Sequence, residues 1–256
     1  MKILCYNLNG IRSAMAKGLI DFLKTDTFDI VCVQETKAHI DQVDVAAFEA
    51  LGYHHHFVSA EKKGYSGVAT FSKQKPTFTQ YGMDVPEFDF EGRVLRTDFD
   101  DLTLLNIYFP SGTSGEERQA VKYKFLDAIY THVQNILIER PNIIVVGDYN
   151  IAHTELDIHN AKSNEKSSGF LPEERAWMTR WLTDLNFVDA FRHKNPELRQ
   201  YSWWSTRFNS RAQNKGWRID YQSVSAALKD NIVSCIQLND IIHSDHCPVL
   251  LEIELL

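Results

Sequence analysis

Asp148 and Asn150 are the two side chains of this sequence best placed to do chemistry together. They follow the aliphatic run 143–146, which predicts a strand buried on both faces, and Gly147 allows a tight turn at its end. Since residues i and i+2 of a strand point to the same side, the carboxylate and the carboxamide are expected to address one reacting atom. Taken alone, the motif favours an ordinary strand-to-loop exit, where Asp and Asn are common turn residues. Its weight comes from similar strand ends elsewhere in the chain.

Other predicted strands end or begin in polar side chains of the same kind. They are Asn7, Asn9, Glu35, Tyr108, Asp220, Asp245 and His246. Together they predict metal-assisted phosphoryl chemistry, because a hard divalent cation held by carboxylates neutralises the charge of a phosphodiester. Oxygen ligands without a Cys/His cluster favour magnesium or manganese over zinc. Asp148 beside Asn150 suits orienting or deprotonating a water, and a histidine paired with an aspartate presents a positive N–H to a phosphate oxygen.

A polar, basic loop between two tryptophans spans 203–217. The basic residues and the tryptophans are Arg207, Arg211, Lys215, Trp203 and Trp217. Aromatic rings beside Arg and Lys suit stacking on nucleic-acid bases and neutralisation of phosphates. The alternative is a surface loop whose tryptophans pack into the core.

The elements that must position these side chains are short apolar strands, which outnumber the helices. This pattern favours an α/β sandwich of two packed sheets with outer helices. Apolar periodicity predicts helices over 42–51 and 115–139, and we include Arg118 and Lys122, near the beginning of the second, among the candidate DNA contacts. No linker, low-complexity run or repeat interrupts the 256 residues, so a single domain over 1–256 is expected.

Composition says more about the cellular context than about the activity. The net charge is −7, but a local basic rim can coexist with an acidic total, so the charge excludes no partner. The four cysteines show no CxxC spacing, which favours reduced thiols in a cytoplasmic protein over disulfides or zinc. The first residues match neither a signal peptide nor a membrane span, and no apolar surface stripe is left over. We therefore expect no membrane association and a monomer.

Seven short motifs occur in the order of one known family. They are NLNG at 7–10, QETK at 34–37, GYSGVA at 64–69, YFP at 108–110, GDYN at 147–150, WRIDY at 217–221 and SDHCP at 244–248. On these motifs, and over nearly the whole chain from Lys2 onward, the sequence closely resembles the exonuclease III family of abasic-site endonucleases, within the endonuclease/exonuclease/phosphatase superfamily.

The resemblance implies a fold and an activity. The fold is a four-layered α/β sandwich in which two packed mixed β-sheets are flanked by helices, with the site at one edge. The activity is Mg²⁺-dependent hydrolysis, with Mn²⁺ as a substitute, of the phosphodiester 5′ to an abasic site in double-stranded DNA, leaving a 3′-hydroxyl. Trimming of blocked 3′ ends and 3′-to-5′ exonuclease action are implied as secondary activities.

The resemblance also implies which residues hold the metal. Glu35 is expected to be a ligand, with Asn7 and Asn9 near the metal and its water shell. Asp245 is expected near the metal through water.

The catalytic roles are implied in the same way. Asp148 is expected to orient or activate the attacking water, and Asn150 to position it. Tyr108 and His246 are expected to contact the scissile phosphate, while Asp220 orients His246.

A pocket for a flipped-out, baseless sugar is implied at Trp203, Trp217 and Ile219. Excluding a base by pocket size is physically inexpensive, because an abasic nucleotide has little stacking to lose. Asn160 matches a family position near the phosphate, and Arg207 stands where family members insert side chains into DNA.

Three alternatives are weighed against this interpretation. A nonspecific nuclease, or a phosphatase of lipids or inositol phosphates, would share the Glu35, Asp148–Asn150 and Asp245–His246 elements but lack the tryptophan-flanked basic loop. A catalytically silent DNA-binding or scaffold module would be expected to lack a site residue, and none is missing.

Overall fold

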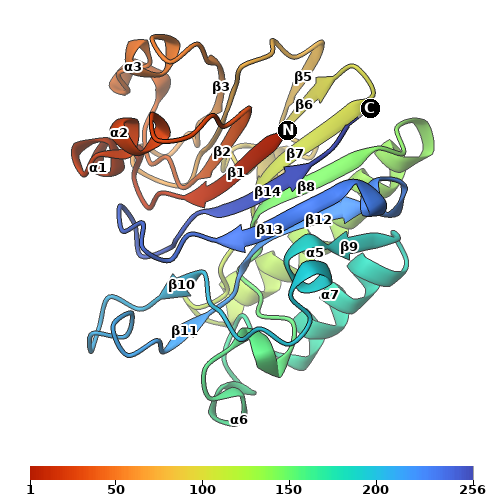
Figure 1. Ribbon diagram of the computed structural model, residues 1–256. Helices are drawn as coiled ribbons and strands as arrows, with labels where there is room; N and C mark the ends of the chain where they lie inside the picture. Colours follow the sequence, from red (N-terminus) through yellow and green to blue (C-terminus); the bar gives the residue numbers. More distant parts are fainter. Residues whose placement is uncertain (256) are drawn as a thin grey trace.

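The computed structural model describes residues 1–255, which form two six-stranded mixed sheets with helices on their outer faces (Figure 1). The first sheet has the order β13-β14-β1-β2-β4-β3, the second has the order β5-β6-β7-β8-β12-β9, and β10 and β11 form a separate ribbon. The strands are β1 Lys2–Asn7, β2 Ile30–Gln34, β3 His54–Val58, β4 Val68–Ser72, β5 Phe78–Tyr81, β6 Val94–Phe99, β7 Leu102–Tyr108, β8 Ile143–Asp148, β9 Phe187–Asp189, β10 Trp203–Trp204, β11 Gly216–Trp217, β12 Asp220–Ser225, β13 Ile232–Gln237 and β14 Val249–Ile253. The helices are α1 Ile11–Ala16, α2 Leu19–Leu23, α3 Ala46–Glu49, α4 Pro86–Asp89, α5 Glu116–Glu139, α6 Ala161–Asn164, α7 Pro172–Thr183 and α8 Ala190–Lys194, with 3-10 turns at Ile40–Gln42, Glu155–Asp157 and Ala226–Asn231.

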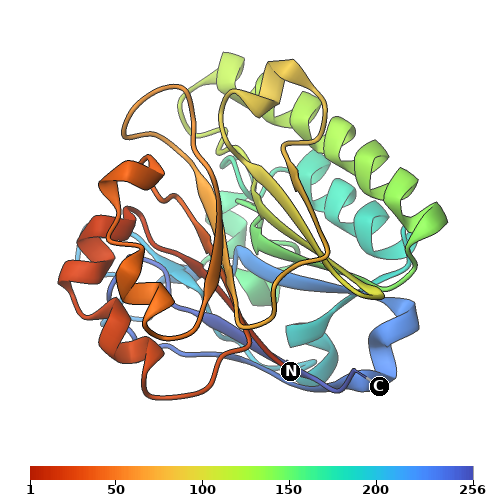
Figure 2. The ribbon, with the colours of Figure 1, turned by 90° about the horizontal axis from the view of Figure 1, so that it is seen from above.

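Three apolar layers hold the sandwich together, and Figure 2 shows the helices on its two sides. Between the sheets, Cys5 and Cys32 of the first sheet share a cluster with Ile144 of the second. The opposite face of the second sheet buries its side chains against α5 and α7, where Val145 belongs to the same cluster as Trp181. The first sheet packs in the same way against α1, α2 and α3. The α/β sandwich expected from the sequence is confirmed.

Each sheet contains one pair of neighbouring parallel strands, and these pairs bring the site together. β1 runs parallel to β2, and β7 runs parallel to β8. An antiparallel strand completes each set, with β14 beside β1 and β12 beside β8. The carboxyl ends of the parallel strands carry Asn7, Glu35, Tyr108 and Asp148, which meet at one edge of the sandwich.

The two helix predictions have different outcomes. The long helix over 115–139 is confirmed as α5. The helix over 42–51 is too long, because a 3-10 turn closed by Gln42 is followed by Val43 in an extended conformation. Only α3, residues Ala46–Glu49, is α-helical there.

The structure also tests the predictions of reduced cysteines and of no membrane span. Within residues 1–255 all four cysteines are buried free thiols, as the absence of CxxC spacing predicted. Over the same residues, every helix is too short or too polar to cross a membrane.

Candidate active site

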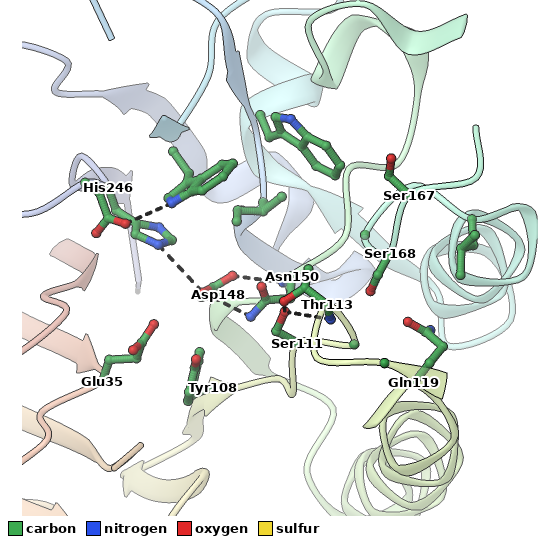
Figure 3. A pocket seen from close by; sticks show the side chains of 18 of the residues that line it. Glu35, Tyr108, Ser111, Thr113, Gln119, Asp148, Asn150, Ser167, Ser168 and His246 are labelled. Atoms are coloured by element: carbon green, nitrogen blue, oxygen red, sulfur yellow. Dashed lines mark hydrogen bonds and ion pairs between the residues drawn. The ribbon is translucent and has the colours of Figure 1, made fainter. Parts of the chain in front are cut away.

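A cleft of about 690 Å³ opens along the edge where the strand ends meet. Glu35, Tyr108, Asp148 and His246 lie around one end of it, and Asn150 follows Asp148 (Figure 3). Its other end is lined by polar side chains of 111–119 and 166–168. The structure therefore brings together the strand-end residues that the sequence singles out.

Asp148 is buried at the centre of this set. Its Oδ2 accepts hydrogen bonds from Nδ2 of Asn7 at 2.9 Å and from Nδ2 of Asn150 at 3.2 Å. Its Oδ1 accepts the backbone N–H of Asn150 at 2.8 Å, and Nε2 of His246 lies 3.9 Å from Oδ2. Contacts from both sheets thus hold the carboxylate in one orientation.

Asn150 reaches Asp148 by a route other than strand alternation. β8 ends at Asp148, and Asn150 has a left-handed backbone with a φ of 51°. The predicted convergence is found, but the strand geometry offered as its reason is wrong. A turn folds Asn150 back, and its Nδ2 also donates to the carbonyl oxygen of Phe109 at 2.9 Å.

Gly147 sets the register of the strands beside this turn. A Cβ at Gly147 would lie 1.8 Å from the carbonyl oxygen of Ile107, so only glycine permits this approach of β8 to β7. In the resulting register, Asp148 has Tyr108 on one side and Asp220 on the other. Three candidate catalytic residues are therefore adjacent across three strands.

Glu35 stands in a left-handed conformation, with a φ of 49°, directly after β2. Its Oε1 accepts from Nδ2 of Asn7 at 2.9 Å, and Nζ of Lys37 lies 2.8 Å from its Oε2. Lys37 also donates to Oδ1 of Asn9. Although burial opposes it, the Lys37 ammonium keeps the pKa of Glu35 below its ordinary value. The sequence reasoning missed Lys37, although it is the last residue of the QETK motif.

His246 is buried and tied to Asp220. Its Nδ1 is 2.8 Å from Oδ2 of Asp220, which also accepts the hydroxyl of Ser202 at 2.6 Å. Ser202 Oγ in turn accepts the backbone N–H of Asp220 at 3.1 Å. Ser202 fixes the carboxylate that orients the imidazole, and nothing in its sequence surroundings distinguished it from an ordinary serine.

Carboxylates outnumber cations around this edge. Glu35, Asp148, Asp220 and Asp245 face Lys37 and His246, so the fully ionised set carries a surplus of two negative charges. We call these six residues the acidic cluster. Burial, followed by the charges of Asp220 and Glu35, raises the pKa of Asp148 to about 7. Burial alone would lower the pKa of His246, but Asp220, and then Asp148 and Asp245, raise it to about 10.

Tyr108 rests against a second cation. The guanidinium of Arg93 lies 4.6 Å from the centre of its ring and donates to its carbonyl oxygen at 3.0 Å. Burial and the nearby Glu35 raise the pKa of Tyr108 well above its ordinary value. The hydroxyl is therefore a hydrogen-bond donor at neutral pH, and Arg93 is a further residue that the sequence reasoning missed.

The aromatic residues predicted to form a pocket lie beside the acidic cluster. Trp203 and Trp217 pack edge to face, with ring centres 6.2 Å apart, and both line the cleft together with Ile219. Nε1 of Trp203 donates to Oδ2 of Asp245 at 3.0 Å, and Nδ2 of Asn9 donates to Oδ1 at 3.0 Å. We call Trp203, Trp217 and Ile219 the aromatic wall. Through Asp245, this wall is connected to the acidic cluster.

Two of the basic residues predicted to contact DNA are used inside the protein. Lys122 is completely buried and paired with Glu174, so its assignment as a DNA contact is wrong. Arg211 donates to the carbonyl oxygens of four residues and holds the loop to the rest of the chain. The sequence shows that these residues are basic, but it does not show that their charged groups bind other groups of the protein.

The other candidate contacts differ in accessibility. Arg118 is partly exposed, but its guanidinium is bidentate to Glu91, at 2.8 and 2.7 Å. Arg207, Lys215 and Asn160 are exposed to solvent. These three side chains are free to approach a ligand.

Comparisons with known proteins agree with this geometry. Residues 4–246 match the model of the endonuclease/exonuclease/phosphatase family. The chain is 41% identical to an exodeoxyribonuclease of Bacillus subtilis over the full length of both proteins. It is 35% identical to a DNA-(apurinic or apyrimidinic site) endonuclease of Dictyostelium discoideum, covering all of this chain and 71% of the relative. A 3′-5′ exonuclease from Neisseria meningitidis superimposes over the full length of both chains with a TM-score of 0.93 at 25% identity.

Proposed function

The chain belongs to the endonuclease/exonuclease/phosphatase family, and from that premise we propose that it is a DNA repair nuclease acting at abasic sites. It cuts the phosphodiester 5′ to an abasic nucleotide in duplex DNA, leaves a 3′-hydroxyl, and also removes nucleotides and blocking groups from 3′ ends. One observation carries the proposal. Asp148, Glu35 and the Asp220–His246 pair lie in the same cleft as the packed rings of Trp203 and Trp217. A relative and a solved structure with those activities in their names support it.

The metal of this family fits the acidic cluster, and we propose that it is Mg²⁺, with Mn²⁺ as a substitute. Ligand atoms of Glu35, Asp148 and His246 lie within 4.8 Å of one another. The surplus of two negative charges equals the charge of one divalent ion, and oxygen donors dominate the set. Because its raised pKa keeps His246 protonated, and Asp148 is assigned to the attacking water, we assign the binding of the ion to Glu35, with Asn7, Asn9 and Asp245 around it. When bound, the ion would neutralise phosphate charge.

The protein's own groups can orient the attacking water and hold the phosphate. Asp148 Oδ1 and Oδ2 are fixed by Asn150 and Asn7, so a water bonded to this carboxylate has a defined position. As a carboxylate, Asp148 can accept the proton of that water as a general base. His246 keeps its proton and donates from Nε2 to a phosphate oxygen, and Tyr108 donates its hydroxyl from the other side of Asp148.

The aromatic wall gives selectivity for a missing base. Trp203, Trp217 and Ile219 offer an apolar surface next to the reacting groups, where a flipped-out deoxyribose is held by shape. Gly169 lies so close to this wall that an added Cβ would be 2.9 Å from the ring of Trp217. We assign neutralisation or hydrogen bonding of the DNA backbone to Arg207, Lys215 and Asn160, whose side chains are exposed.

The remaining features of the proposal concern the protein as a whole. We propose that it acts as a single domain and as a monomer, since the cleft is complete within one chain. Its buried free thiols support a reducing, cytoplasmic environment.

The test is cleavage of an end-labelled duplex containing one tetrahydrofuran abasic analogue, beside its intact twin. We expect one Mg²⁺-dependent cut immediately 5′ to the analogue, absent with EDTA. Equal cutting of both duplexes would indicate a general nuclease. Failure to cut either, with phosphate released from small esters, would assign the protein to the phosphatases of the family.

A further inference from the structure

Lys122 and Glu174 form an ion pair that is completely shut off from solvent. Lys122 lies on α5 and Glu174 in the first turn of α7, and both side chains are 0% exposed. Nζ of Lys122 is 2.5 Å from Oε1 of Glu174. Burying two charges is costly unless every partner is satisfied, and apolar residues of the same volume often stabilise a core at least as well. The pair therefore calls for an explanation other than stability.

The lysine holds the turn that carries Asn150. Nζ of Lys122 donates to the carbonyl oxygen of Asn150 at 2.8 Å. On the other side of the same residue, the backbone N–H and Nδ2 of Asn150 are bonded to Asp148. The left-handed Asn150 is thus fixed from both directions.

The glutamate holds the neighbouring wall of the cleft. Its Oε2 accepts the backbone N–H groups of Gly169 at 2.6 Å and Leu171 at 3.0 Å. A Cβ at Gly169 would lie 3.1 Å from the carbonyl oxygen of Asn150 and 2.9 Å from the ring of Trp217. The segment fixed by Glu174 is therefore packed between the catalytic turn and the aromatic wall.

We propose that Lys122 and Glu174 are a positioning pair for the reaction. The pair fixes the Asn150 turn, and through it the carboxylate of Asp148, relative to the wall that contains Trp217. This inference rests on the proposed function for its substrate, but it concerns the alignment of the reacting groups rather than the choice of lesion. Misplacement of such groups by about 1 Å can lower a rate by about 100-fold.

The first part of the test is the double substitution Lys122→Met with Glu174→Gln, which removes both charges and leaves neither stranded. We expect kcat to fall by about 10- to 100-fold, while KM and the Kd for DNA change by less than about threefold. The control is Lys124→Met, which removes an exposed lysine from the same helix and should leave both constants unchanged. All rates are measured well below the unfolding midpoint of each variant.

The second part combines the double substitution with Asp148→Asn and follows single turnovers at excess enzyme. If the pair acts by aligning the carboxylate of Asp148, the double substitution should lower the rate by less than about twofold further in the Asp148→Asn protein. An equal loss in the Asp148→Asn protein and in wild type would overturn the proposal, as would an unchanged kcat in the double variant. The same variants are also assayed for removal of nucleotides from the 3′ end of an intact duplex. If the wild-type protein does not cut at the abasic analogue, that result counts against the proposed function alone, because 3′-end removal still tests the positioning pair.

Discussion

Two buried groups of charges lie on either side of Ile219, and they are balanced differently. On one side, Arg218 and Arg192 neutralise Asp157 and Asp189, with N–O distances of 2.6 to 2.8 Å, and these four residues are the paired cluster. On the other side, Asp220 belongs to the acidic cluster, where carboxylates exceed cations. Although burial opposes it, Arg218 holds the pKa of Asp157 far below its ordinary value, whereas the pKa of Asp148 is raised.

The difference separates charges that maintain the fold from charges that await a ligand. The paired cluster joins the Glu155–Asp157 turn to β9, α8 and the beginning of β12 and has no charge left to offer. The acidic cluster is also hydrogen-bonded, but its net charge is unbalanced without a cation. Buried charge alone therefore does not mark a functional site, but unbalanced buried charge does.

Asp148→Asn should give the largest effect and the clearest contrast. The substitution keeps the shape of the side chain but removes the group that orients and deprotonates water, so we expect kcat to fall by about 1,000-fold or more. The Kd for abasic DNA should be retained and the protein should stay folded, because the amide keeps the shape of the carboxyl group and the cluster loses one surplus negative charge. Gel cleavage and DNA binding measure the first two, and near-normal cleavage would remove Asp148 from the mechanism.

Asp157→Asn should show the opposite pattern. It leaves Arg218 buried with one partner fewer, and breaking such a pair costs about 3 kcal/mol or more of unfolding free energy. The kcat of the folded fraction should remain within about threefold of wild type, since no atom of Asp157 lines the cleft. Urea unfolding and cleavage assays at low temperature measure the two quantities. An unfolding free energy close to that of wild type would mean that the paired cluster does not stabilise the fold.

Mg²⁺ should stabilise the protein through the acidic cluster only. At about 100 times its Kd, a ligand that binds the folded state adds about 2.7 kcal/mol to the free energy of unfolding. We expect this gain in wild type and in Asp157→Asn, and its loss in Glu35→Gln. Thermal unfolding in Mg²⁺ and in EDTA measures it without any substrate. The same stabilisation in Glu35→Gln as in wild type would place the ion elsewhere.

The sequence predicted the strand ends of the acidic cluster because apolar runs followed by Asp, Asn or Glu have a direct structural meaning. Asp148 and Glu35 were found in this way, and the sandwich followed from the same runs. Partners distant in sequence were not predictable, because side-chain type does not reveal burial. Lys122 is 52 residues from Glu174, and Arg218 is 61 residues from Asp157. The motif WRIDY contains one residue of each cluster, Arg218 and Asp220, and of these two the sequence analysis assigned a role only to Asp220.

The pH dependence of stability in EDTA should show the smallest difference between the clusters. For Asp148, a pKa raised from 3.8 to about 7 means that the folded state binds the extra proton over this range, so stability falls as pH rises from about 4 to 7. For Asp157, the lowered pKa gives stability that is complete above the unfolded value of 3.8 and lost only as pH falls through the lower folded value. From Asp148 alone, the free energy of unfolding in urea should therefore be about 2 kcal/mol lower at pH 7 than at pH 5 in wild type. Asp148→Asn should reduce this difference to the smaller contribution of His246, whose pKa is also raised, and Asp157→Asn should keep all of it. A difference as large in Asp148→Asn as in wild type would mean that another group in the acidic cluster carries the proton.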